Sequence, residues 1–384
     1  MIEFLSGALA VLSARANEII EELERVSEVP SPVIRQCQKV VSQTRQHLRL
    51  IDRHGKEVEG ISHAVQNGLS VPSVEPLVKG YLKAYHDLRR QIDAVEEFFA
   101  GHITRFSSSD EFLTRTASAI WREANLPGDS PVAVASTSGY FCTLASLGIV
   151  FAPPNDVQRL LILPDLYHEC GHLVHSGSTL LSDKPRFFAA LPAYIHELEQ
   201  QSRRYARPLP PDLTVSIYFK WLEYWAEEVA CDTLAARLVG PAFGWCNLHL
   251  CIRHPKIFSS SKHPADAART RHIFRVLRRC GWAQEVSDME RRWEQYVRTI
   301  GAQKPFNYDD YHPDELFIAV MEDVEASTSQ LAEYKMGACA VADVLNEAWK
   351  RFLDDPLSYP AWEKSKVNEM GRVATFSADA KTAA

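Results

Sequence analysis

The residues from His168 to His172 have the types and the spacing needed to hold a metal ion. They form the pattern H-E-x-x-H, with Glu169 directly after the first histidine. On an α-helix, residues four apart share a face, so both imidazoles can reach one ion. Glu169 lies beside that face, where its carboxylate can exchange a proton with a metal-bound water without binding the metal. The pattern therefore predicts a zinc site with Glu169 as general base.

The flanking residues predict that the motif lies on a buried helix. Residues 161–175 are mostly apolar around the histidines. Pro164 suits the first turn of a helix, and Asp165 suits the positive end of the helix dipole. A helix this apolar is expected to be buried, and buried histidines need partners such as a metal ion.

A third zinc ligand is expected downstream, because a catalytic zinc site has three protein ligands and one open position. Residues 221–238 indicate a second buried helix, which Gly240 ends. Glu228 and Asp232 lie four apart on one face of it. We expect Glu228 to bind the metal and Asp232 to accept the second ring N–H of a ligand histidine. Glu227 remains the alternative ligand. Glu228 is favoured because an aspartate, Asp232, follows it by four residues, whereas Cys231 follows Glu227 by four.

This pair of motifs resembles the gluzincin clan of zinc metallopeptidases. The chain departs from the clan's commoner E-x-x-A-D form at Cys231, which is also small and apolar. The resemblance implies zinc as cofactor, Asp232 behind a ligand histidine, and Glu169 as the catalytic base. It also implies three metal ligands, which are His168, His172 and Glu228.

A third segment narrows the resemblance. Residues 263–269 begin with His263-Pro264 and end with Arg269, and they resemble the H-P-x4-R segment of CAAX-prenyl-protease-like gluzincins. The resemblance covers about residues 110–280 and implies a zincin-like catalytic core, with His263 near the active site and a structural Arg269. That family is typically membrane-embedded. This chain has no apolar stretch of about 18 residues, so we expect a soluble relative without a membrane span.

Composition favours a soluble cytoplasmic protein. The 384 residues are 46% hydrophobic and 24% charged, as in ordinary globular enzymes. The net charge of −7 argues against nucleic acid or an anionic membrane as partner. Eight cysteines without a C-x-x-C pair indicate reduced thiols. The acidic start of the chain is unlike a signal peptide.

The order of apolar patterns predicts an α+β, mainly α protein, in which a zincin-like core with a small sheet is flanked by helical bundle segments. Residues 1–106 carry heptad-spaced seams, which predict a helical bundle that packs on the catalytic unit or binds a protein partner. Residues 107–282 are the expected catalytic domain. Residues 283–384 are expected to be helical, with a frayed tail.

Three short strands are expected just before the motif helix, at residues 131–136, 140–144 and 148–152. In gluzincins an edge strand at this place binds the substrate backbone by strand addition. By that resemblance the third strand, 148–152, is the candidate edge strand. An ordinary buried strand is the alternative interpretation.

The expected function is that of a zinc-dependent endopeptidase, in which a zinc-activated water attacks a peptide bond and Glu169 is the base. The expected substrate is a peptide or protein. His263 is the oxyanion donor that the resemblance implies, and Tyr218 and Tyr224 are alternatives by spacing. One competing hypothesis is a zinc-stabilised helical adaptor or regulatory protein without catalysis. Another keeps a hydrolase but replaces the protein substrate by a small peptide or another amide.

Overall fold

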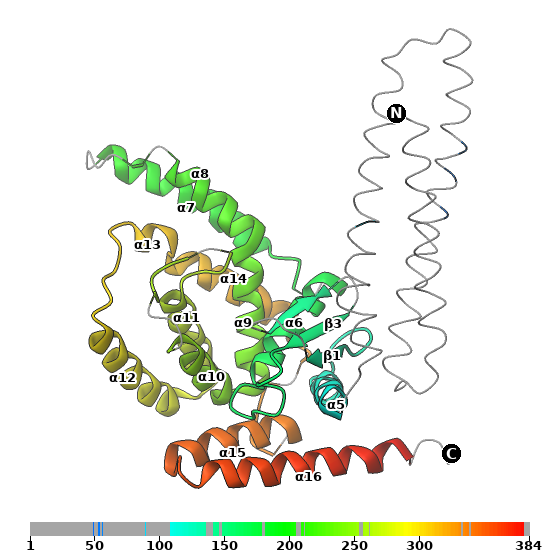
Figure 1. The fold of residues 1–384 in the computed structure, drawn as a ribbon. Helices are drawn as coiled ribbons and strands as arrows, with labels where there is room; N and C mark the ends of the chain where they lie inside the picture. The colour runs from blue at the N-terminus through cyan, green and yellow to red at the C-terminus, as the bar shows by residue number, and fades with distance from the viewer. Residues whose placement is uncertain are drawn as a thin grey trace. The chain divides into compact units, whose positions relative to one another are not determined.

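The structure is a computed structural model (Figure 1). It describes residues 108–379 except for short gaps at residues 136–140, 146–147, 179–180, 205–208, 211, 253–255, 261, 332 and 338. Four isolated positions before residue 108 are also described: Arg49, Arg53, Lys56 and Arg89. The helical bundle predicted for residues 1–106 otherwise lies outside the described residues, as do residues 380–384. The unit described below runs from Phe112 to the C-terminal end of the chain.

The described chain is mainly helical and contains one small sheet, which confirms the α+β, mainly α class. The helices are α5 Ser108–Glu123, α6 Asp165–Gly177, α7 Pro185–Arg204, α8 Leu213–Lys220, η4 Trp221–Trp225, α9 Ala226–Val239, α10 Pro241–Cys251, α11 Asp266–Arg279, α12 Ala283–Ile300, α13 Tyr308–Tyr311, α14 Asp314–Ser327, α15 Ala340–Asp354 and α16 Tyr359–Asp379. The strands are β1 Val132–Ala135, β2 Cys142–Leu144 and β3 Ile149–Ala152.

The sheet has the strand order β1-β3-β2. β1 pairs with β3 in parallel, and β2 pairs with β3 antiparallel, with Thr143 opposite Val150. All four residues of β3 are buried. The prediction that β3 is an edge strand is therefore wrong, because strands pair on both of its sides. Among the described strands, β2 is the edge strand that packs against α6.

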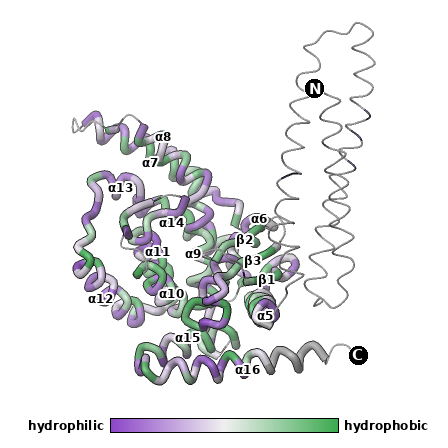
Figure 2. Tube along the Cα trace, viewed as in Figure 1, coloured by the Kyte–Doolittle hydropathy of each residue, from purple (hydrophilic) through white to green (hydrophobic). Residues whose placement is uncertain are grey.

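Helix α9 is the centre of the unit. It packs along α6 and also contacts α11 and α14 (Figure 1). Every residue of α9 except Glu227 is buried, so other parts of the chain enclose the helix on all sides. In Figure 2 hydrophobic residues gather around this centre, whereas the outer helix α12 buries only Val286 and Met289.

Helix α9 continues from α8 through a turn of π-helix, η4. The buried Trp221 and Trp225 anchor this turn in the core, with their rings 5.9 Å apart. The residues between them, 222–224, are exposed. Helix was predicted here, but the π-turn was not. A π-turn changes the rotation of the helix just before Glu227 and Glu228, and such turns are frequent near functional sites.

Two long-range polar contacts connect later helices of this unit to segments on either side of the motif helix. The buried Glu363 of α16 accepts the N–H of Leu160, just before α6, at 2.8 Å. Asp323 of α14 accepts the N–H of Phe187 in the first turn of α7, at 2.9 Å. These carboxylates accept hydrogen bonds from backbone amide N–H groups that have no acceptor within their own helix or turn. Among the described helices, none is long and apolar enough to cross a membrane.

Candidate metal centre

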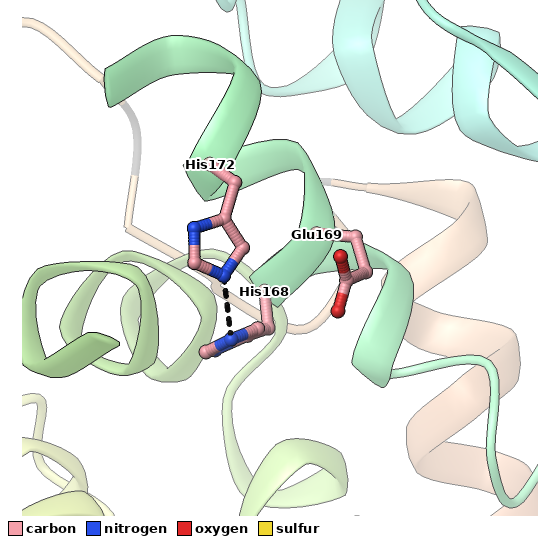
Figure 3. A group of neighbouring side chains, drawn as sticks. All are labelled: His168, Glu169 and His172. Atoms are coloured by element: carbon pink, nitrogen blue, oxygen red, sulfur yellow. Dashed lines mark hydrogen bonds between the residues drawn. The ribbon is translucent and has the colours of Figure 1, made fainter. Parts of the chain in front are cut away.

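The two motif histidines meet on one side of α6. His168 and His172 point their Nε2 atoms at each other across 3.2 Å (Figure 3). His168 is buried, and only 17% of the His172 side chain is exposed. Leu166, Tyr167 and Val174 bury the opposite side of the helix. The helix and the face shared by its histidines were both predicted from the sequence.

Glu228 brings a carboxylate against both imidazoles. Its Oε2 lies 3.3 Å from His168 Nε2, and its Oε1 lies 3.6 Å from His172 Nε2. The Oε2 atom is buried and accepts no hydrogen bond from the described residues. A buried carboxylate oxygen without a donor is costly unless a cation neutralises it.

The spacing of these atoms matches the donor set of a zinc ion. With bonds of about 2.05 Å, ligands at the corners of a tetrahedron lie about 3.3 Å apart, which is about 1.63 bond lengths. The 3.2 Å between the two Nε2 atoms is close to that edge, and the Glu228 carboxylate places Oε2 3.3 Å from His168 Nε2 and Oε1 3.6 Å from His172 Nε2. Two imidazoles and a carboxylate are also a common donor set for catalytic zinc. The residues present therefore fit a zinc ion.

Helix α9 also holds the far nitrogen of each histidine. Asp232 Oδ1 lies 2.9 Å from His168 Nδ1, and Glu227 Oε1 lies 2.8 Å from His172 Nδ1. At His172 this contact is a hydrogen bond, which favours the tautomer with its proton on Nδ1 and leaves Nε2 a lone pair for a metal. At His168 the two atoms are almost equally close, but their angles are not those of a hydrogen bond. The contact of Asp232 with a motif histidine is the arrangement expected from its spacing.

Glu227 is part of a longer chain of contacts that was not predicted. Its Oε2 lies 3.5 Å from Nδ1 of His175, and Lys184 Nζ lies 2.9 Å from Nε2 of His175. Burial lowers the pKa of Lys184. The one feature of the sequence that could have indicated these contacts is the position of His175, three residues after His172 on the same helix.

In Figure 3 the side chain of Glu169 lies apart from the paired imidazoles. Its Oε2 accepts a hydrogen bond of 2.6 Å from the hydroxyl of Thr143 on β2, and its side chain is buried. One ligand atom from each of His168, Glu169 and His172 nevertheless lies within 4.8 Å of the other two, so this group could hold a metal ion. Thr143 was not predicted, because nothing in its spacing connects it to the motif.

The third motif also reaches this site. His263 Nε2 lies 3.3 Å from Glu228 Oε1, and its side chain is 56% exposed. Arg269 donates two hydrogen bonds of 2.7 and 2.8 Å to the oxygens of Asp232. Such a two-point contact fixes the carboxylate that in turn orients His168. Tyr218 and Tyr224 are 39% and 45% exposed, and no described contact joins either to the histidines.

The electrostatics of the site favour a cation. Burial alone lowers the pKa of His168, but its contacts with Asp232 and Glu228 raise that pKa well above its usual range. Burial likewise raises the pKa of Glu228, but His168 and His263 bring it well below its usual range. Both shifts mean that the carboxylates of α9 favour positive charge between the imidazoles. A divalent ion supplies that charge directly.

Comparisons with known proteins found no match for this chain among protein-family models, curated proteins or solved structures.

Proposed function

We propose that the protein is a zinc-dependent endopeptidase with a zincin-like core, in which His168, His172 and Glu228 hold the metal. The observation that carries the proposal is that the two Nε2 atoms lie 3.2 Å apart, with one oxygen of the Glu228 carboxylate 3.3 Å from His168 and the other 3.6 Å from His172. The nitrogen–carboxylate contacts behind both imidazoles support it, because a metal-binding histidine usually has its other ring nitrogen held by a carboxylate, a backbone carbonyl or water. The gluzincin resemblance of the three motifs agrees with this geometry.

Each remaining residue then has a specific role. Zinc, when bound, supplies a Lewis acid that acidifies water and polarises a carbonyl. Glu169 would remove a proton from the attacking water as the new C–O bond forms and charge develops on the carbonyl oxygen. It would then deliver that proton to the amide nitrogen, so that the C–N bond breaks and the amine leaves. His263 is exposed and adjacent to Glu228, so it can donate a hydrogen bond to the oxygen that gains charge. β2, the strand next to α6, aligns the substrate backbone in place of the predicted β3.

The competing function is a metal-stabilised adaptor without catalysis. Its supporting observation is that Glu169 lies close enough to the two imidazoles to be a metal ligand. With Glu169 bound beside His168, His172 and Glu228, four protein ligands would close the site, as in structural zinc centres. The two functions therefore differ in what Glu169 does.

Replacing Glu169 by glutamine separates the two functions. Glu169→Gln keeps the size of the side chain but removes the base, so we expect unchanged folding, bound zinc and a loss of several orders of magnitude in turnover. The measurement is cleavage of a mixed fluorogenic peptide library and of casein, with zinc quantified by mass spectrometry in each sample. Exposed Glu223, on the π-turn before α9, provides the control Glu223→Gln, which should cleave at the wild-type rate. Wild-type turnover in Glu169→Gln would exclude the peptidase mechanism.

A further inference from the structure

The hydroxyl of Thr143 makes two contacts with Glu169. It lies 2.6 Å from the carboxylate Oε2 and 3.2 Å from the backbone oxygen of the same residue. No other described side chain is hydrogen-bonded to the Glu169 carboxylate. Thr143 is itself held in place, since its strand pairs with the buried strand β3. The sheet thus fixes the position of the carboxylate from outside helix α6.

A general base next to a metal site has to stay off the metal. A carboxylate is a good zinc ligand, and a catalytic zinc keeps one position open for water. Glu169 has the reach to fill that position, because its ligand atom lies within 4.8 Å of those of His168 and His172. Helix geometry alone does not prevent this, since the side chain of glutamate has three rotatable bonds.

We propose that Thr143 is a positioning residue that keeps the Glu169 carboxylate out of the coordination sphere of the metal. Its hydrogen bond turns one carboxylate oxygen toward the strand and leaves the other available for proton transfer. The inference rests on the proposed metal site and deepens the proposed function. Since Thr143 lies on β2, the strand proposed to align substrate also sets the orientation of the base.

The test compares Thr143→Val with Thr143→Ser in protein that is stripped of metal by a chelator and reloaded with one equivalent of cobalt(II). Valine keeps the shape of threonine without the hydroxyl, so Glu169 is released to bind the metal. We expect the visible absorption of cobalt to weaken, because an added carboxylate raises the coordination number. Turnover of the zinc form should fall about 10–100-fold, as for other residues that act through a group at the metal. Serine should restore both properties.

Two further variants make the result specific. In a Glu169→Gln background the amide is a poor ligand, so adding Thr143→Val should leave the cobalt spectrum unchanged. Thr116→Val is the matched control, because Thr116 is buried and donates its hydroxyl to the backbone oxygen of Phe112 within α5. It should alter neither the spectrum nor turnover. Thermal melting of every variant checks that the fold is retained.

The inference is overturned if Thr143→Val keeps the wild-type cobalt spectrum, or if its spectral change persists undiminished in the Glu169→Gln background. A different result would contradict the proposed function. A wild-type protein that binds cobalt but cleaves no peptide would reject the peptidase, while the spectra of the Thr143 variants would still decide whether this threonine restrains Glu169.

Discussion

At the scale of single residues, the two neighbouring glutamates of α9 contact different nitrogen atoms of the motif histidines. Glu228 faces the Nε2 atoms of both histidines, whereas Glu227 contacts the Nδ1 of His172 from behind. We therefore expect Glu228→Ala to abolish zinc binding at micromolar metal. Glu227→Ala should weaken it about 10–100-fold, because it removes only the orienting contact. Competition of each variant with a zinc-chelating dye measures both effects.

Two further variants serve as references for the zinc affinities of Glu228→Ala and Glu227→Ala. Asp232→Ala should resemble Glu227→Ala, because Asp232 orients the other histidine from the same helix. The exposed Glu223 provides a matched control, and Glu223→Ala should bind zinc like the wild type. Full zinc affinity in Glu228→Ala together with its loss in Glu227→Ala would exchange the two roles.

At the scale of elements, the site depends on how closely α6 and α9 approach. A Cβ built on Gly171 would lie 3.0 Å from the Cα, Cβ and Sγ atoms of Cys231. Such a contact is too short, and the backbone Cα cannot move aside independently of α9. Gly171→Ala should therefore push the helices apart, lower the free energy of unfolding by about 1–3 kcal/mol, and weaken zinc binding.

Gly177 provides the matched control for this prediction. It ends the same helix, and a Cβ there would meet no heavy atom within 4 Å. Urea unfolding and zinc titration of both alanine variants give the measurement. Equal behaviour of Gly171→Ala and Gly177→Ala would show that the separation of the helices does not set the metal site.

The elements also show what a sequence can and cannot reveal about this fold. The helix of the motif and the three strands were predictable, because apolar patterns and turn residues act over short distances. The order of the strands was not, since the pairing of β3 with both neighbours depends on the whole sheet. For the same reason the contact of Thr143 with Glu169 could not be predicted, because it joins residues far apart in the chain.

At the scale of the whole molecule, the packed unit also buries two histidines, His272 and His312, that are not among the proposed metal ligands. His272 of α11 contacts the hydroxyl of Thr233 at 2.8 Å, and its buried Nδ1 has no hydrogen-bond partner among the described residues. Burial lowers the pKa of His272 to about 4. His312 stacks on Trp225, and burial lowers its pKa to about 4 as well. Protonating either imidazole would place a charge inside the core.

These two histidines should make the protein less stable in mild acid. An unfolded histidine has a pKa near 6.5, so between about pH 6.5 and 4 the unfolded chain binds protons that the folded chain does not. Stability is therefore full above pH 6.5, falls as the pH drops through this window, and stops falling from this cause below about pH 4. Each histidine contributes at most about 3 kcal/mol over the window.

His272→Phe tests this expectation, because phenylalanine fills the space beside Phe317 but does not titrate. The free energy of unfolding in urea is measured from pH 7.5 to 4.5, with chelator present so that metal release does not contribute. The variant should lose less stability than the wild type on acidification, by up to about 3 kcal/mol. Exposed His196 on α7 gives the control His196→Phe, which should follow the wild-type curve. Parallel curves for wild type and His272→Phe would show that His272 takes up its proton without unfolding the core.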